Sequence, residues 1–294
     1  MTPNALLRFI LLAAIWGASF LFMRILAPEV GALWTAESRL AIGAVALLIY
    51  LQIRRIPLNL EHWRHYAVAG FLNCALPFSM FAVAGKLLPA GYSAVLNAAV
   101  PLWTTLFAAW FLGDKITPMR MAALALGVLG VALVAQPAAD VNAGWMFIGG
   151  VAACLVATAC YALTGIYLKK YGKGLRPQAT ATMSQTLGAL LILPLALMSG
   201  VPTSISAQAA VSGLLLGLLC SGVAFLLYYR LLDEIGVVMT SGVTFLIPLF
   251  GIFWGAVLLH ERLGWHVFAG CALIIGGALL LYRSNQLTTQ KAKT

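Results

Sequence analysis

The feature that most constrains this chain is a series of ten long apolar runs, separated by short segments rich in charged residues, proline and glycine. The runs span residues 5–26, 32–51, 66–85, 91–112, 118–136, 145–167, 179–199, 209–229, 238–259 and 265–283. Each is close to the length of about 20 apolar residues that a helix needs to cross a bilayer. A membrane-spanning strand would be shorter and would alternate apolar with polar residues. We therefore predict an all-α integral membrane protein with ten transmembrane helices.

The composition excludes several other classes of protein. Of the 294 residues, 62% are hydrophobic and only 9% are charged, whereas a soluble domain carries about 25% charged residues. A cytosolic enzyme, a secreted disulfide scaffold and a disordered chain are therefore excluded. The five cysteines lie in apolar runs without metal-ligand spacing, so we interpret them as small buried hydrophobes. Because the sequence has no zinc-protease motif, phosphate loop or nucleophile elbow, we expect neither an enzyme nor a metal or cofactor site.

The net charge of +10 has two interpretations, binding of nucleic acid or a basic bias of cytoplasmic loops. The basic residues form short clusters between apolar runs, which favours the second, so the expected partner is the lipid bilayer and not nucleic acid. If the N-terminus lies inside, 14 of the 18 basic residues fall on the inner side. We predict a multi-pass protein of a bacterial-type cytoplasmic (inner) membrane, with both termini cytoplasmic and residues 285–294 as a disordered tail. The first run is too long for the core of a cleavable signal peptide.

The sequence also contains an internal repeat. A shift of 147 residues places Pro101 on Pro248, residues 114–115 (DK) on 261–262 (ER), and Gly130 on Gly277. The predicted halves, 1–138 and 139–284, then contain five helices each, and an odd number forces the two halves into opposite orientations. Inverted repeats are typical of transporters, in which they surround a site near the membrane midplane. Duplication for stability alone is the alternative.

Several of these elements resemble a known family. They are WGASF at 16–20, Arg39 in the second run, and the P…GDK and P…HER segments, each followed by a glycine-rich run. Together they resemble the drug/metabolite transporter superfamily, in its ten-helix EamA-type branch, most strongly over 224–281. The whole chain is also similar to bacterial YddG-type exporters of aromatic and other neutral amino acids. The resemblance implies an exporter, and it implies a structural role for Arg39.

Three prolines indicate where a substrate site lies. A proline within a helix leaves the carbonyl four residues earlier without its N–H donor. The prolines are Pro77, Pro101 and Pro248, and the carbonyls belong to Asn73, Asn97 and Thr244. An unpaired carbonyl is costly in hydrocarbon, so we expect these helix kinks to face a cavity. For one proline alone, a kink satisfied by a neighbouring hydroxyl or water is the better explanation, whereas the three together favour a cavity.

Aromatic residues near the middle of the runs complete the predicted substrate site. The predicted substrate-binding residues are Trp16, Phe20, Asn73, Phe78, Phe81, Asn97, Trp103, Tyr161, Tyr228, Thr244 and Phe245. Apolar walls with a few polar groups suit a neutral amino acid, held by uncharged groups. No carboxylate lies at mid-depth of a run, so we expect no obligatory proton coupling. For each phenylalanine alone, helix packing is the better explanation.

We therefore predict a transporter that exports neutral amino acids, including aromatic ones, and related metabolites from the cytoplasm by alternating access. The alternative within the same class is efflux of apolar drugs or other small metabolites. A membrane enzyme or a structural membrane protein is the alternative from another class. A closed inverted repeat of ten helices can work as a monomer.

Overall fold

The computed structural model describes residues 1–137 and 144–291, and these ranges contain helices but no strand. The α-helices are α1 Pro3–Ile53, α2 Trp63–Ala69, α3 Leu76–Leu87, α4 Ala90–Asn97, α5 Val100–Leu112, α6 Pro118–Val134, α7 Trp145–Tyr171, α8 Pro177–Met198, α9 Ala207–Gly217, α10 Ala224–Ser241, α11 Ile247–Leu258 and α12 Trp265–Lys291. Between them lie two 3-10 turns, η1 Leu60–His62 and η4 Gly242–Phe245, and two π-helical turns, η2 Gly70–Ala75 and η3 Leu218–Val223. The predicted all-α fold is confirmed for the described ranges.

Eight helical stretches in the described ranges are long and apolar enough to cross a membrane. One of them, α1, is interrupted at Gly31, whose φ of 82° breaks the helix between two predicted runs. The helix α6 is apolar but shorter, with 17 residues. Helical backbone therefore covers nearly all of each predicted run.

The outward faces of these helices are apolar. Large side chains that are more than half exposed include Leu7, Val45, Trp110, Leu190 and Leu258. Soluble monomers rarely expose apolar surface on this scale, because its contact with water is unfavourable. The surface is therefore suited to contact with lipid chains, as expected for a multi-pass membrane protein.

At the three prolines for which kinks were predicted, the helix is interrupted and not merely bent. Each proline lies in the first turn of a new helix. Pro77 follows the π-helical turn η2, Pro101 follows the break between α4 and α5, and Pro248 follows the 3-10 turn η4. Proline suits the first turn because that position needs no N–H donor and favours its fixed φ. The second π-helical turn, η3, has no proline and was not predicted.

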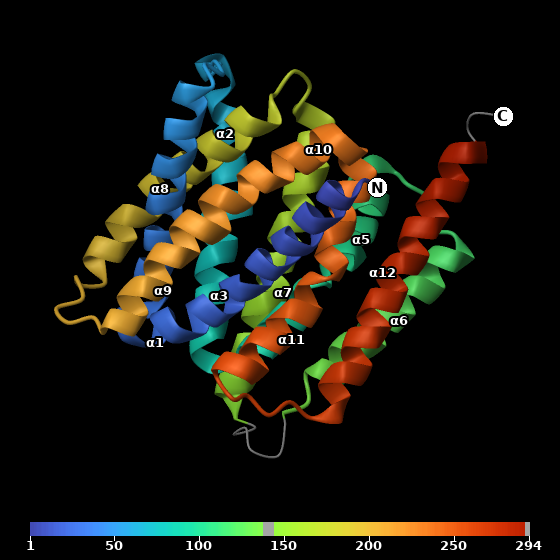
Figure 1. Cartoon of the computed structure of the whole chain (residues 1–294). Helices are drawn as coiled ribbons and strands as arrows, with labels where there is room; N and C mark the ends of the chain where they lie inside the picture. Colours follow the sequence, from blue (N-terminus) through green and yellow to red (C-terminus); the bar gives the residue numbers. More distant parts are fainter. Residues whose placement is uncertain (138–143, 292–294) are drawn as a thin grey trace.

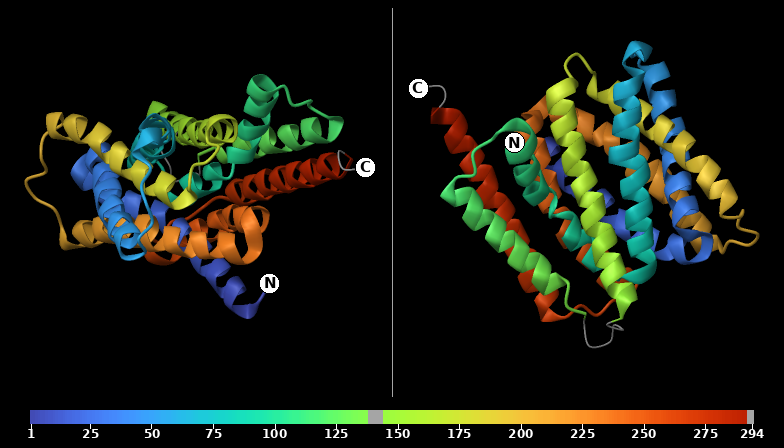
Figure 2. Two further views of the ribbon diagram at one scale, coloured as in Figure 1. Left: turned by 90° about the horizontal axis from the view of Figure 1, so that it is seen from above. Right: turned by 180° about the vertical axis from the view of Figure 1, so that it is seen from behind.

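The long helix α1 lies at the centre of the assembly and packs against α3, α8, α9 and α11. In Figure 1, the N-terminus, the end of α12 and the α7–α8 loop lie at one end of the molecule, and the α8–α9 and α11–α12 loops lie at the other. Figure 2 shows α6 and α12 together along one edge. The two ends of the helical bundle thus carry different sets of loops.

Glycines bring α6 and α12 into backbone contact. A Cβ atom added to Gly130 would lie 2.8 Å from the carbonyl oxygen of Gly270, and one added to Gly277 would lie 2.7 Å from that of Ala123. Because the partner's number falls from 277 to 270 as α6 advances from 123 to 130, the two helices are antiparallel. Such close approach is possible only where at least one side chain is missing.

The helix α12 extends into the segment that was predicted to be a disordered tail. It continues to Lys291, so residues 285–291 are helical, and residues 292–294 lie outside the described ranges. A helix that has formed gains one hydrogen bond for each residue added, so it can extend past the apolar run that anchors it. Most of the predicted junction between the halves, 138–143, also lies outside the described ranges.

Candidate functional site

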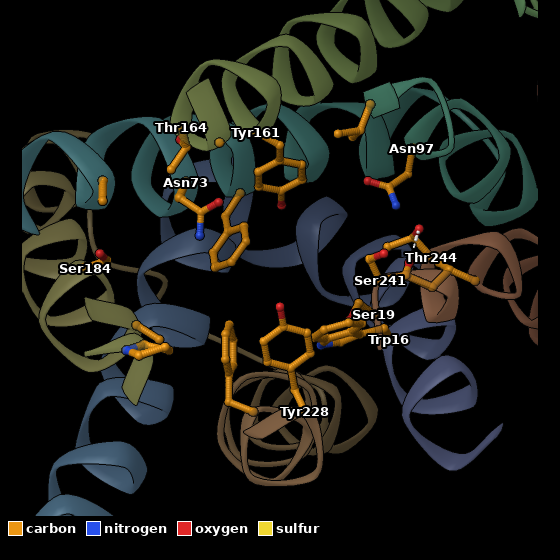
Figure 3. Close-up of a pocket in the computed structure, with 18 of the residues that line it drawn as sticks. Trp16, Ser19, Asn73, Asn97, Tyr161, Thr164, Ser184, Tyr228, Ser241 and Thr244 are labelled. Atoms are coloured by element: carbon orange, nitrogen blue, oxygen red, sulfur yellow. Dashed lines mark hydrogen bonds between the residues drawn. The ribbon is translucent and has the colours of Figure 1, made fainter. Parts of the chain in front are cut away.

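A cavity of about 600 Å³ lies among the interrupted helices (Figure 3). Its lining comes from α1, α7, α8, α10, the segments around η2 and η4, and the break between α4 and α5. The lining includes ten of the eleven predicted substrate-binding residues: Trp16, Phe20, Asn73, Phe78, Phe81, Asn97, Tyr161, Tyr228, Thr244 and Phe245. Residues that are far apart in the sequence therefore surround one space.

Trp103 is the predicted residue that lies elsewhere. Its half-buried indole stacks on Phe107, with ring centroids 5.7 Å apart, and it does not line the cavity. Two positions along α5 place it about 200° around the helix from Pro101, which does line the cavity. Pro77 and Pro248 are buried outside the lining. Trp103 is therefore corrected to a packing residue of α5.

Aromatic rings form the wall of the cavity. Trp16 lies 5.7 Å from Tyr228 and 6.2 Å from Phe225 between ring centroids. Phe81 lies 5.4 Å from Phe20, edge to face. Each such pair contributes about 0.5–1.5 kcal/mol beyond its buried area, so the wall is held by its own ring contacts. Phe225 was not predicted, although its position in the repeat, 147 residues after Phe78, indicates it.

Uncharged polar groups lie at both ends of this wall. In Figure 3, Asn73, Thr164 and Ser184 gather at one end, and Asn97, Ser241 and Thr244 gather at the other. The hydroxyls of Tyr161 and Tyr228 point toward each other across the space between the two ends. A small solute that has both polar groups and an apolar body matches this arrangement.

Arg39 also lines the cavity, which the sequence analysis did not predict. It is only 7% exposed. Its Nε donates to the hydroxyl of Ser221 at 2.9 Å, and its guanidinium carbon lies 3.8 Å from the centroid of the Phe78 ring. Among the described residues, no carboxylate oxygen lies within 4.0 Å of its side-chain nitrogens. The expectation that uncharged groups alone form the site is therefore corrected, because a fixed positive charge is present.

The position of Arg39 was missed because the sequence does not give the angle of the helix break before it. The break at Gly31 starts a new helical segment, so Arg39 lies about 12 Å along it, roughly two turns in. Glu37, two residues earlier, points to a different side of the helix. Glu37 is buried outside the cavity lining, and its Oε2 has no hydrogen-bond partner among the described residues.

A carboxylate closes one end of the molecule. Glu261, in the α11–α12 loop, accepts from the backbone N–H of Ala90 at 2.7 Å and from that of Gly91 at 3.2 Å. These are the first residues of α4, whose own cap residue, Pro89, supplies no side-chain acceptor. Burial raises the pKa of Glu261, against the lowering effect of the two N–H donors and of nearby Arg24.

The other end lacks this contact. Asp114, which is 147 residues before Glu261, makes no side-chain hydrogen bond within the described part of the chain. The cavity reaches this end at the α7–α8 loop, where Gly172, Leu175 and Pro177 line it. The described conformation is therefore capped at the Glu261 end, and its cavity extends to the other.

A bundle of apolar helices around a cavity with polar ends is the architecture of a membrane transporter. The chain belongs to the EamA-like transporter family, whose model matches it twice, over residues 4–136 and 148–283. This family is part of the drug/metabolite transporter superfamily, and the resemblance found in the sequence is confirmed.

Relatives of known name span nearly the whole chain. The uncharacterized transporter YoaV of Bacillus subtilis is 22% identical over 94% of this chain and 96% of its own. A "probable terminal-alkyne amino-acid exporter" of Streptantibioticus cattleyicolor is 27% identical over 99% and 97%. A "probable amino-acid metabolite efflux pump" of Escherichia coli is 24% identical over 91% of both chains. One crystal structure superposes with a TM-score of 0.65 over 100% of both chains, and at 17% identity this similarity shows the fold alone.

Proposed function

We propose that this protein exports neutral amino acids, including aromatic ones, and related metabolites from the cytoplasm by alternating access. The observation that carries the proposal is the aromatic-walled cavity of about 600 Å³ with polar groups at both ends. This volume lies within the range of about 300–1,000 Å³ for small-molecule pockets. The names of two relatives, which include amino-acid export, support this substrate class. Efflux of apolar drugs or other small metabolites is the competing function.

The proposed architecture is ten transmembrane helices in two inverted halves, 1–138 and 139–284. Corresponding elements support the repeat: α5 and α11 begin 147 residues apart, and so do α6 and α12. The same shift relates Gly113 and His260, which both have positive φ. The antiparallel contact of α6 with α12 supports inversion, because these two helices hold equivalent places in the halves.

In the proposed mechanism, the two ends of the molecule open in turn. Glu261 caps α4 in the described conformation and releases it when the opposite conformation forms. Asp114, its repeat counterpart, then takes the equivalent role at the segment that begins after Gly236, where φ is 76°. Helix N-termini favour such carboxylates because their first N–H groups lack partners.

We place the Asp114 end in the cytoplasm of a bacterial-type cell, with the protein in the inner membrane and both termini inside. The basic residues of the loops support this orientation, since Lys169, Lys170, Lys173 and Arg176 surround the α7–α8 loop. The described conformation is then open toward the cytoplasm, the side from which an exporter loads.

We also propose that transport is not coupled obligatorily to protons and that one copy of the chain suffices. No aspartate or glutamate of the described ranges lines the cavity, and proton-driven carriers typically place a carboxylate at their site. Both the loading end and the closed end are formed within one chain.

Flux in proteoliposomes tests this function. The liposomes are loaded with radiolabelled phenylalanine, tryptophan or threonine, with and without a pH gradient, and contain the wild type or the Asn97→Ala variant. The control is Thr186→Ala, which removes a hydroxyl of α8 that does not line the cavity. We expect saturable flux that does not depend on the pH gradient and that is lower only in the Asn97→Ala variant. Flux driven by the gradient would overturn the uncoupled mechanism, and drug flux without amino-acid flux would favour the competing function.

A further inference from the structure

We propose that Arg39 binds the carboxylate of the substrate, so that the carrier selects solutes with a carboxylate and rejects those with a net positive charge. This inference rests on the proposed function and narrows its substrate class. It starts from a guanidinium that lines the cavity and is 7% exposed. Buried charges in membrane helices are costly, and they are usually paired.

The hydrogen bonds of Arg39 leave part of its guanidinium free. The group has five N–H donors. Nε uses one on the hydroxyl of Ser221, and Nη1 lies 4.0 Å from the sulfur of Met23, which is a weak acceptor. Since no described carboxylate lies within 4.0 Å, an incoming carboxylate finds unused donors and an uncompensated charge.

The surroundings hold the guanidinium in a fixed place. The Phe78 ring lies 3.8 Å from its central carbon, and Ser221 belongs to the π-helical turn η3, where regular helix bonding is interrupted. Arginine stacked in this way loses little further freedom when it forms paired bonds with a carboxylate.

The lining also contains a buried hydroxyl that lacks a partner in the described part of the chain. The hydroxyl of Ser184 is buried, and it has no hydrogen-bond partner among the described residues. Asn73 lies at the same end of the cavity (Figure 3). These groups offer neutral hydrogen bonds to the oxygen or ammonium atoms of a bound amino acid, while its apolar side chain lies along the aromatic wall.

The electrostatic consequence is a rule for specificity. An amino acid is a zwitterion, so its carboxylate pairs with Arg39, its ammonium donates to neutral acceptors, and its binding adds no net charge to the cavity. An amine without a carboxylate places a second positive charge in the same low-dielectric space, where like charges repel strongly. Cationic drugs are therefore poor substrates, whereas a carboxylate without an ammonium still binds.

Competition for phenylalanine flux in proteoliposomes tests the inference. The competitors are 3-phenylpropionate, which lacks the ammonium, and phenethylamine, which lacks the carboxylate. With the wild-type protein, 3-phenylpropionate is expected to inhibit phenylalanine flux, and phenethylamine is expected to inhibit it at least tenfold more weakly. Equal inhibition by the two, with phenylalanine flux intact, would overturn the inference and leave the proposed function standing. No phenylalanine flux at all would overturn the proposed function itself.

Variants locate the effect at Arg39. Arg39→Gln is expected to raise the KM for phenylalanine about ten- to a hundredfold, as expected for loss of hydrogen bonds to a charged group, and to abolish the preference for 3-phenylpropionate. Arg39→Lys keeps the charge without the planar fork and is expected to retain the preference at a higher KM. Arg64→Gln, which removes an exposed arginine, is the matched control. If Arg39→Gln does not fold, the wild-type competition and Arg39→Lys still decide the question, and an Arg39→Lys variant without the preference would overturn the inference.

Discussion

Removal of the Glu261 carboxylate should release the closed end of the carrier. In Glu261→Ala, the N–H groups of Ala90 and Gly91 lose the acceptor oxygens that lie 2.7 and 3.2 Å away. Donors left without a partner cost about 1–3 kcal/mol, which corresponds to a shift of about 5- to 150-fold toward the conformation that is open at this end. The expected result is a larger population of that conformation, not unfolding.

A cysteine at Ser93 measures this shift. Ser93 is 2% exposed and lies on α4, one turn beyond the contact with Glu261. While the open population is small, the rate at which Ser93→Cys reacts with a membrane-impermeant maleimide is proportional to that population. Glu261→Ala should therefore raise this rate about 5- to 150-fold. The five native cysteines are buried. Labelling of Glu261→Ala without the Ser93→Cys substitution measures how much they contribute to the reaction.

Glu261→Gln is the matched comparison for this experiment. Burial raises the pKa of Glu261, so a neutral side chain is tolerated there, and the glutamine oxygen can still accept from one of the two N–H groups. The labelling rate should therefore rise much less than in Glu261→Ala. If Glu261→Ala leaves the rate at Ser93→Cys unchanged in folded protein, the contact does not hold this end closed, and the reasoning fails.

Three further predictions follow from individual contacts. Gly130→Ala forces a methyl group against the backbone of α12 and should cost about 1–3 kcal/mol, seen as a lower Tm in detergent. Gly276→Ala places its methyl group in open space and should leave the Tm unchanged, so equal Tm values for the two variants would contradict this packing. Glu37→Gln should leave phenylalanine flux unchanged with and without a pH gradient, and a change in the response to the gradient would identify Glu37 as a proton site. Trp16→Ala should raise the KM for phenylalanine at least tenfold while Trp103→Ala should not, and the opposite order would place the site along α5.

The sequence was sufficient to predict helices because apolar runs of this length have no other stable form in a bilayer. It also led to Asn73, Asn97 and Thr244, because each lies four residues before a proline and a helix break falls at or just before each of these prolines. These three residues line one cavity in the structure. Proline suits the first turn of a new helix, so the sequence indicates these three breaks.

Relations that depend on the angle of a helix break were not predictable. Trp103 faces away from the cavity because α5 starts anew after Asn97, and the sequence does not give the rotation at that break. Arg39 enters the lining because α1 breaks at Gly31. The π-helical turn η3 has no proline to announce it, although it lies close to the repeat equivalent of η2.

The antiparallel contact between α6 and α12 has a consequence for the energy of switching. Under the proposed inverted repeat, this contact joins equivalent helices, so each half contributes the same helix to it. With identical halves, the two end conformations would be related by a twofold rotation and equal in energy, and each would be occupied half of the time. The resting preference therefore resides only where the halves differ, such as Glu261 against Asp114 or His260 against Gly113. Exchanging such pairs between the halves would invert the direction in which the empty carrier faces.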